Sequence, residues 1–90
     1  MKVEVSYVAQ VRSAAGVGAE TVELPAAATA GELAAKVADA HGQTLRGLLL
    51  DADGQVRKTI LVFINNRQSG SATPLKDNDR VTFLSPLSGG

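Results

Sequence analysis

The chain has 90 residues, of which 44% are apolar, so its length and composition indicate a single domain with one packed core. Nine basic residues balance nine acidic ones, and Arg57-Lys58 is the only adjacent basic pair, which argues against nucleic-acid binding. The absence of cysteine excludes disulfides and thiolate chemistry, and without a long apolar span or a signal peptide we expect a soluble, cytoplasmic protein with no membrane association.

Two alternating segments open the chain and predict a β-hairpin. The first, residues 2–9, places its apolar side chains on one face at a period of two residues: Val3, Val5, Tyr7 and Ala9. Residues 13–18 (SAAGVG) are small and turn-permitting, so we expect a short loop there. The second segment, residues 20–24, turns Val22 and Leu24 inward and is stopped by Pro25.

A helix is predicted to begin at Thr29. Thr29 and Glu32 fit a capping box, in which each side chain accepts a hydrogen bond from the other residue's backbone amide. Leu33, Val37 and Ala40 follow at helical spacing. Gly42 stands where a left-handed C-terminal cap is expected.

The stretch after the helix contains three leucines, a turn and an apolar strand. Leu45, Leu48 and Leu49 fit either a short helical turn or a short strand, and residues 51–54 (DADG) predict a turn. Residues 59–64 (TILVFI) are apolar throughout, which is typical of a strand buried on both faces. Asn65-Asn66 then favours a tight turn with positive φ.

The last part of the chain predicts a loop, a strand and a tail. Residues 73–79 indicate a loop and residues 80–84 (RVTFL) a final strand. The element order gives an α+β fold, a mixed four- to five-stranded sheet with one main helix packed on one face. This order in so short a chain points to a ubiquitin-like roll over residues 1–84, with the first and last strands parallel and adjacent. Residues 85–90 form an extended, flexible tail in this interpretation.

The tail sequence (SPLSGG) suits insertion into another protein. Pro86 fixes its own φ and biases Ser85 toward an extended conformation. Fully extended, residues 85–90 reach about 20 Å. Gly89 and Gly90 lack Cβ atoms, so a narrow channel can enclose their backbone. The residues expected to contact a partner are Phe83, Pro86, Leu87, Ser88 and Gly89.

The terminal carboxylate of Gly90 is the predicted reactive group. A free carboxylate is a poor electrophile, but ATP-dependent activation to an acyl-adenylate allows attack on the carbonyl by sulfur, giving a thiocarboxylate, or by an amine, giving an amide. A passive interaction domain with an incidental tail is the third alternative, because short motifs have a high rate of false positives.

Three segments resemble the MoaD/ThiS family of ubiquitin-like sulfur carrier proteins, and in particular the small subunit of molybdopterin synthase. They are VSYVAQVRSAAG at the start, LVFINNRQ in the middle and LKDNDRVTFLSPLSGG at the end, the last being the most specific. The resemblance covers essentially the whole chain. Gly89, Gly90, Pro86 and Phe83 match the family's terminal glycine pair, tail proline and final-strand aromatic residue.

The resemblance implies a β-grasp fold and adenylation of Gly90 by an E1-like enzyme. It further implies conversion to a thiocarboxylate that passes sulfur to an acceptor enzyme such as the large subunit of molybdopterin synthase, with no permanently bound cofactor and ATP used by the activating enzyme. Ser85 stands where molybdopterin-type members often have a second proline, and DADGQVRKTI is longer than in the smallest thiamine-type carriers. Carriers for cysteine, thiamine or tRNA thiolation, and protein modifiers joined to lysines, share the general pattern.

Other signals point to structure rather than to chemistry. His41, the only histidine, has no companion ligand or nucleophile in the sequence and is expected to be structural or solvated. The DADG turn lacks the downstream glutamate of a calcium loop, and no metal site is predicted. We therefore expect no autonomous active site. The candidate acceptors of a conjugated tail are Lys2, Lys36, Lys58 and Lys76, and the candidate contacts to an acidic partner are Arg67, Lys76 and Arg80.

Overall fold

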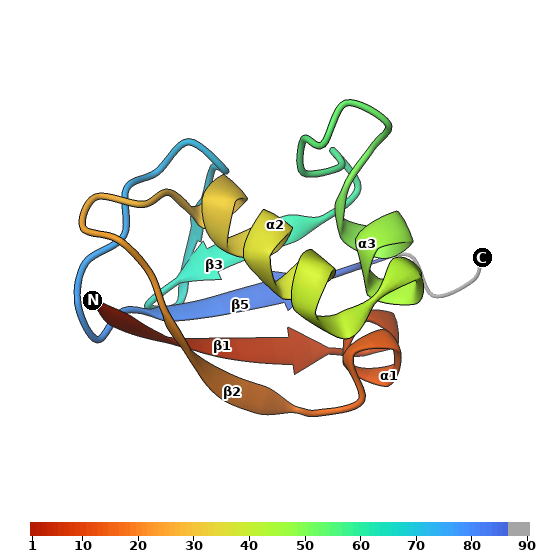
Figure 1. Cartoon of the computed structure of the whole chain (residues 1–90), viewed down its shortest axis with the longest axis horizontal. Coiled ribbons are helices and arrows are strands. Elements are labelled where there is room, and N and C mark those ends of the chain that lie inside the picture. The colour runs from red at the N-terminus through yellow and green to blue at the C-terminus, as the bar shows by residue number, and fades with distance from the viewer. Residues whose placement is uncertain (87–90) are drawn as a thin grey trace.

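The computed structural model of the chain describes residues 1–86, and Figure 1 shows a sheet with helices on one side and at one end. Within these residues the elements are, in order, β1 (Lys2–Val8), α1 (Gln10–Ala15), β2 (Ala19–Glu23), α2 (Ala30–His41), α3 (Gln43–Leu49), β3 (Leu61–Ile64), β4 (Arg67–Ser69) and β5 (Arg80–Leu84). The predicted strands and main helix are all present, and two shorter helices accompany them.

The strands form one mixed sheet in the order β2-β1-β5-β3-β4. β1 and β5 pair in parallel at its centre, with Val5 opposite Val81 and Val8 opposite Leu84. β2, β3 and β4 each pair antiparallel with their neighbours. The prediction that the first and last strands lie side by side and parallel is therefore confirmed.

One face of the sheet is covered by α2 and α3 and forms the core. The alternation predicted for β1 and β2 is confirmed, because Val3, Val5, Tyr7, Val22 and Leu24 are all at most 9% exposed. The largest side chains that are almost completely buried come from both layers: Phe83, Leu33, Leu45 and Leu49. One core therefore spans the sheet and its helices.

The predicted capping box at the start of α2 is present. The Thr29 amide donates to Glu32 Oε1 at 2.8 Å, and the Glu32 amide donates to Thr29 Oγ1 at 3.2 Å. Ala40, expected in the buried stripe, is exposed instead, because Ala34 and Ala38 fill the close contacts beneath the helix. Gly42 has φ 101° and ψ −172°, so the predicted left-handed cap is wrong: the chain turns there directly into α3.

The connection between β1 and β2 differs from the prediction of a short loop. It contains α1, in which Val11 and Ala15 are buried one turn apart and Gly16 (φ 80°) supplies the left-handed cap. Ala9, predicted to belong to the strand, is exposed and has φ 59°. The strand therefore ends at Val8, because the backbone leaves the sheet at Ala9 to begin the helix.

The leucine-rich segment after α2 is a helix, and the apolar segment that follows the turn is a strand. Residues 43–49 are the helical alternative, α3, with Leu45 and Leu49 buried. β3 is buried on one face only: Val62 and Ile64 face the core, whereas Leu61 and Phe63 are half-buried. The predicted burial of β3 on both faces was wrong. The helices α2 and α3 cover the side of the sheet that carries Val62 and Ile64, and they leave the side with Leu61 and Phe63 uncovered.

The turns predicted around β3 are confirmed. Asn65 and Asn66 have φ 52° and 70° and connect β3 to β4. Asp51 Oδ1 accepts hydrogen bonds from the amides of Asp53 and Gln55, which closes the turn at residues 51–54. No helix within residues 1–86 is long and apolar enough to cross a membrane.

Candidate functional site

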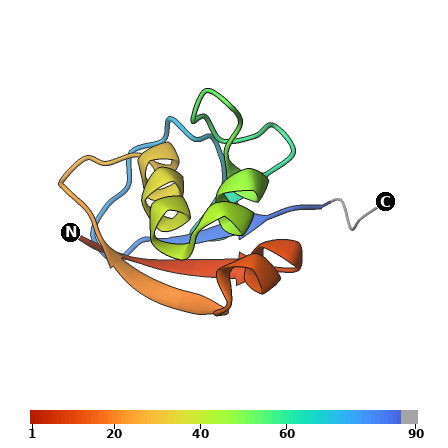
Figure 2. The same ribbon diagram turned by 45° about the vertical axis from the view of Figure 1, so that its right-hand side comes forward.

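The candidate site begins where β5 ends, at a segment that we call the tail root, Ser85 and Pro86. In both views of the fold, β5 runs out of the body between α1 and α3 (Figures 1 and 2). Ser85 is half-buried and Pro86 is exposed, so the chain reaches the surface at Pro86. The predictions for Leu87, Ser88, Gly89 and Gly90 lie outside the described residues.

Next to the tail root, the uncovered face of the sheet carries an apolar patch of four side chains: Val8, Leu61, Phe63 and Leu84. The register explains why they lie together, since Leu84 pairs with Val8 on β1 and with Leu61 on β3. Phe63 is on the same face as Leu61, two residues along β3. Val8 is 41% exposed and the other three are half-buried. An apolar surface in this position is suited to contact with another protein.

Phe83 was predicted to contact a partner, and its position does not allow this. Its side chain is 0% exposed, because Phe83 shares the core-facing side of β5 with Val81. Leu84, its neighbour, points to the opposite face. On the sheet, the apolar contact expected from Phe83 is thus available only from the patch on the opposite face, which includes Leu84.

The remainder of the uncovered face is polar and becomes charged away from the tail root. Ser6 and Thr82 pair beside the patch, and Glu4 and Arg80 pair further along, with Arg80 Nε 3.7 Å from Glu4 Oε1. Both side chains of this ion pair are largely exposed, so it contributes little to stability. The face therefore has an apolar end at the tail root and a charged end at the start of β5.

A hydrogen-bonded cluster on the covered side joins Tyr7, Glu20 and His41. Tyr7 Oη donates to Glu20 Oε2 at 2.6 Å, and His41 Nε2 contacts the same oxygen. Burial of the Tyr7 hydroxyl, together with its bond to the Glu20 carboxylate, raises the pKa of Tyr7. Burial alone would raise the pKa of Glu20, but the hydrogen bonds from Tyr7 and His41 and the attraction to His41 lower it.

This cluster fastens the end of α2 to the edge strand β2, so His41 has a structural role, as predicted. The partners of His41 were not predicted, although the sequence contains one signal of them. Glu20 has the same strand parity as the inward-facing Val22, and a carboxylate on a covered face requires hydrogen-bond donors. The side chains of His41 and Glu20 are only 19% and 30% exposed, and the ring of His41 packs edge-on against Tyr7.

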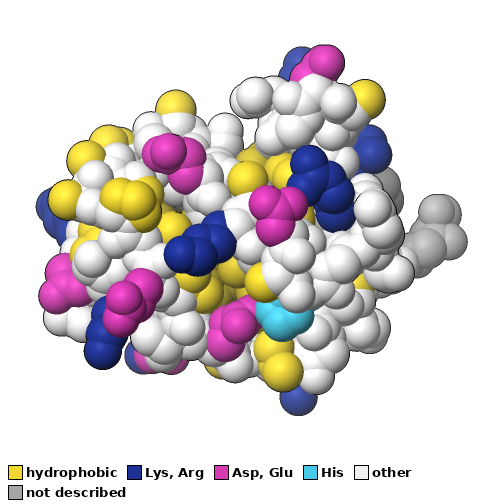
Figure 3. Space-filling model, in the orientation of Figure 1, with side chains coloured by type: hydrophobic (Ala, Val, Ile, Leu, Met, Phe, Trp, Pro, Cys, Tyr) yellow, Lys and Arg dark blue, Asp and Glu magenta, His cyan; other side chains and the backbone are white. Residues whose placement is uncertain are grey.

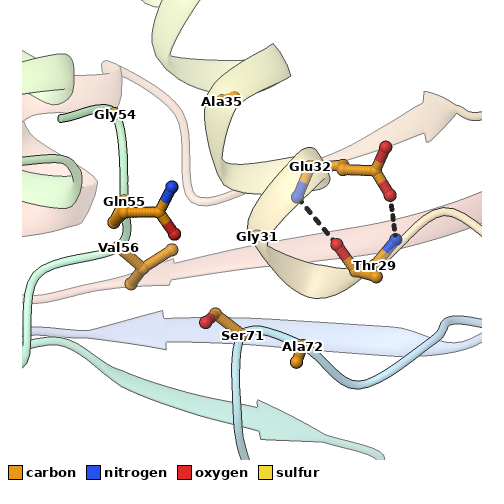
Figure 4. Close-up of a pocket in the computed structure, with 9 residues that line it drawn as sticks. All are labelled: Thr29, Gly31, Glu32, Ala35, Gly54, Gln55, Val56, Ser71 and Ala72. Carbon is orange, nitrogen blue, oxygen red and sulfur yellow. Dashed lines mark hydrogen bonds between the residues drawn. The ribbon is translucent and has the colours of Figure 1, made fainter.

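A cavity of about 420 Å³ lies between α2 and the turn at residues 51–54. Gln55 and Val56 extend toward α2 across it (Figure 4). The N-terminus of α2 has no amide left for a ligand there, because the Ala30 and Gly31 amides donate to Thr73 O and Ser71 O, and Thr29 accepts from Glu32 and Leu33. The cavity therefore lacks the donors that an anion would need.

Side chains that could bind a metal ion do not cluster within residues 1–86. No cluster of three or more histidine, aspartate or glutamate side chains that could hold a metal ion occurs there. On the helix side, acidic and basic side chains are interspersed and do not form a patch of one sign (Figure 3). Asp79 closes a turn, because its carboxylate accepts hydrogen bonds from Asn65 Nδ2 and from the Lys76 amide, both at 2.8 Å.

A mixed sheet with parallel central strands, a helical layer on one face and a final strand that leads out of the body defines a ubiquitin-like protein of the β-grasp fold. SAMP1 from Haloferax volcanii shares this fold with a TM-score of 0.90 at 23% identity, covering 100% of both chains. Urm1 from Trypanosoma brucei gives 0.79 at 24% identity, over 99% of this chain and 95% of its own.

The chain belongs to the ThiS family, whose sequence model matches residues 5–90. It is also 34% identical to the molybdopterin synthase sulfur carrier subunit of Chlamydomonas reinhardtii, over 100% of both chains. The resemblance to MoaD/ThiS proteins seen in the sequence is thereby confirmed.

Proposed function

We propose that this protein carries sulfur on its terminal glycine, Gly90, for the synthesis of molybdopterin. The observation that carries the proposal is the family match, which extends through the SGG sequence to residue 90. The 34% identical sulfur carrier subunit of molybdopterin synthase, aligned over its whole length, supports the molybdopterin pathway. The direction of β5, which brings Pro86 to the surface, supports presentation of the residues that follow.

The chemistry takes place in partner enzymes and proceeds in two steps. A carboxylate oxygen of Gly90 attacks the α-phosphorus of ATP, and pyrophosphate leaves, giving an acyl-adenylate in an E1-like enzyme. A sulfur donor at the level of hydrosulfide then attacks the activated carbonyl, and AMP leaves with the former carboxylate oxygen. The product is a thiocarboxylate, whose sulfur passes to a precursor bound by the large synthase subunit.

In this proposal the chain's own residues bind the partner and position the tail. The apolar patch of Val8, Leu61, Phe63 and Leu84 docks on the partner, because Val8 is exposed and the other three are half-buried, so a contact removes further apolar surface from water. Pro86 removes one amide donor and fixes one dihedral angle, which reduces the entropy lost when the tail enters a channel. Gly89 and Gly90 offer no side chain that obstructs attack on the carbonyl.

Intact mass spectrometry tests the proposal. The protein is incubated with ATP, an E1-like enzyme of the molybdopterin pathway and sulfide. We expect a mass increase equal to the exchange of one oxygen for one sulfur, and no increase when ATP is omitted or when Gly90 is deleted. An unchanged mass, under conditions that convert an established carrier, would contradict the proposal.

A second measurement distinguishes sulfur delivery from protein modification. An activated Gly90 that accepts an amine becomes joined to lysines of target proteins, and after tryptic digestion peptide mass spectrometry detects the segment that follows Arg80, VTFLSPLSGG, as a remnant on those lysines. Remnants without a thiocarboxylate would favour a modifier. A thiocarboxylate without remnants favours the carrier that we propose.

A further inference from the structure

The strand β2 forms one edge of the sheet and leaves backbone groups free to bond another chain. The Tyr7 amide donates to Gly18 O at 2.9 Å, and the Leu24 amide donates to Met1 O at 2.8 Å. Because the backbone groups of successive strand residues point to opposite sides, the even-numbered residues from 18 to 24 bond to β1 and the odd-numbered ones face away from it. The residues of β2 whose amides and carbonyls point out from the sheet are Ala19, Thr21 and Glu23.

One half of this edge is closed and the other half is open. Lys36 Nζ donates to Glu23 O at 2.7 Å, so a side chain of α2 covers the outward carbonyl at the end of β2. A lysine on an edge strand is a common device against pairing with another chain. The outward amides and carbonyls of Ala19 and Thr21, by contrast, make no hydrogen bond within residues 1–86. The spacing of two residues between them matches the spacing at which an added strand forms its hydrogen bonds.

The opposite edge of the sheet offers less to an added strand. This edge is β4, which is three residues long. The Asn65 amide donates to Arg80 O on β5, so alternation along β3 directs the backbone of Val62 and Ile64 toward β4. Their partners are the first and last residues of β4, and only Gln68 faces outward. Very short edge strands resist pairing with another chain, so β2 is the edge that can accept a strand.

The open half of β2 lies at the end of the sheet from which the tail departs. β1 and β5 are parallel and end there, at Val8 and Leu84, whereas β2 is antiparallel to both and begins there, at Ala19. Only β1 separates β2 from β5, a distance of about 10 Å between strand axes (Figure 1). Val8 and Val17, the exposed large apolar side chains among the described residues, both lie at this end. A protein that contacts the apolar patch and receives the tail therefore also reaches the open edge.

We infer that an extended strand of the activating enzyme adds to the sheet as a sixth strand, beside Ala19 and Thr21. The inference rests on the proposed function. The side chains of these two residues carry no charge, and the Glu20 carboxylate between them is already engaged in the hydrogen-bonded cluster of the covered side. A strand that is uncharged at these positions therefore fits, and its affinity comes from backbone hydrogen bonds. The Arg12 guanidinium lies against Gly18, beside the start of the edge, where it can donate to a carbonyl of the added strand.

A proline in β2 tests the inference, because it removes an outward amide and leaves every bond to β1 in place. Proline is tolerated at edge positions whose N–H faces solvent, and Thr21 is such a position. The matched control, Thr21→Val, keeps the amide and the shape of the side chain. In ATP–pyrophosphate exchange by the E1-like enzyme, Thr21→Pro should raise the KM for the carrier about tenfold, and Thr21→Val should leave it within about twofold. The kcat of both should stay within about twofold of the wild type, because the tail is unchanged.

Amide hydrogen exchange gives a second measurement, which uses the wild-type protein. In the free protein, the amides of Ala19 and Thr21 should exchange faster than those of Glu20 and Val22, which bond to β1. Saturation with the enzyme should slow the exchange of Ala19 and Thr21 about tenfold or more. Gln68, which faces outward at the other edge, is the internal control and should keep its rate.

The outcomes separate strand addition from the proposed function. Unchanged exchange of Ala19 and Thr21 in the complex would overturn strand addition and leave the proposed function intact, as would equal KM values for folded Thr21→Pro and Thr21→Val. If Thr21→Pro does not fold, the hydrogen-exchange result alone decides. Slower exchange in the protein alone, as its concentration rises, would assign the edge to a second copy of the chain and contradict the inference. A wild-type protein that supports no ATP–pyrophosphate exchange would overturn the proposed function and strand addition with it.

Discussion

The covered and uncovered faces of the sheet use the same strands in different ways. On the covered face, Val5, Val81 and Phe83 are 0% exposed, and Tyr7 finds a hydrogen-bond acceptor in Glu20. On the uncovered face, the alternate residues of those strands include Val8 and Leu84, which keep part of their surface in water. An apolar side chain on the first face stabilises the fold, and one on the second face is available to a partner. Stability and recognition can therefore be changed separately by choosing the face.

Phe83 and Leu84, which are adjacent on β5 and face opposite sides, give the sharpest test of this separation. Phe83→Ala should lower the free energy of unfolding by about 3–5 kcal/mol, because it opens a cavity in the core. Leu84→Ala should cost about 1 kcal/mol or less, because the side chain is half-buried. Urea unfolding followed by circular dichroism measures both, and equal losses would contradict the assignment of the two faces.

The apolar patch should show the opposite preference. Leu61→Ser and Leu84→Ser together should weaken binding to the activating enzyme by about tenfold or more, because a truncated interface anchor costs more than about 1 kcal/mol. The matched control is Thr82→Ser on the same strand and face, which keeps the polar row beside the patch. Isothermal titration calorimetry provides the affinities, and an unchanged affinity in the leucine variant would place the contact elsewhere.

The hydrogen-bonded cluster of the covered side should make stability depend on pH. Glu20→Gln should cost about 1–2 kcal/mol at neutral pH, because hydrogen bonds to a charged acceptor are lost. Since the pKa of Glu20 is lowered from its ordinary 4.5 in the folded state, the stabilisation is complete above about pH 4.5 and disappears as the pH falls through the lower folded value.

Unfolding of wild type and Glu20→Gln at several pH values measures this dependence. The difference in the free energy of unfolding between the two proteins should shrink from pH 6 toward pH 3, following the titration curve of a single group. Tyr7→Phe removes one hydrogen-bond donor to the Glu20 carboxylate. In this background, Glu20→Gln should therefore cost less free energy of unfolding than it does in the wild type. A difference in the free energy of unfolding that stays constant over this pH range would show that the cluster does not contribute to the loss of stability in acid.

The smallest effect is expected on the outer side of the helical layer. Gly47 lies within α3 and a Cβ there would meet nothing within 4 Å, so Gly47→Ala should stabilise the protein by about 0.5–1 kcal/mol. Gly31 in α2 is the matched control, because its Cβ would lie 3.2 Å from Ser71 O. Gly31→Ala should therefore give less stabilisation or a loss, and thermal melts compare the two substitutions.

Periodicity and capping were sufficient to predict most of the fold from the sequence. Val3, Val5 and Tyr7 alternate without interruption, and Thr29 and Glu32 are correctly spaced for the capping box, so local signals and final structure agree. α1 was missed because its small residues also suit a turn. The buried pair Val11 and Ala15, spaced by four residues, was the signal of a helix in that segment.

The candidate site could be predicted only in part, because its geometry depends on contacts between distant segments. Residues 59–64 are apolar on both faces, which suggested two-sided burial; the strand register was needed to show that Leu61 and Phe63 belong to an exposed patch with Leu84. The contact of His41 with Glu20 spans 21 positions in the chain, and no local pattern reveals such a contact. Which residues lie next to the tail root can likewise be known only from the strand register.

The place of β5 between β1 and β3 has a consequence for synthesis on the ribosome. The centre of the sheet is filled by Arg80–Leu84, which is translated after the other described strands, so these strands cannot complete their pairing until it emerges. A nascent chain that stops short of this segment leaves β1 and β3 without their shared neighbour. A polypeptide that lacks Arg80–Leu84 therefore cannot complete the native sheet.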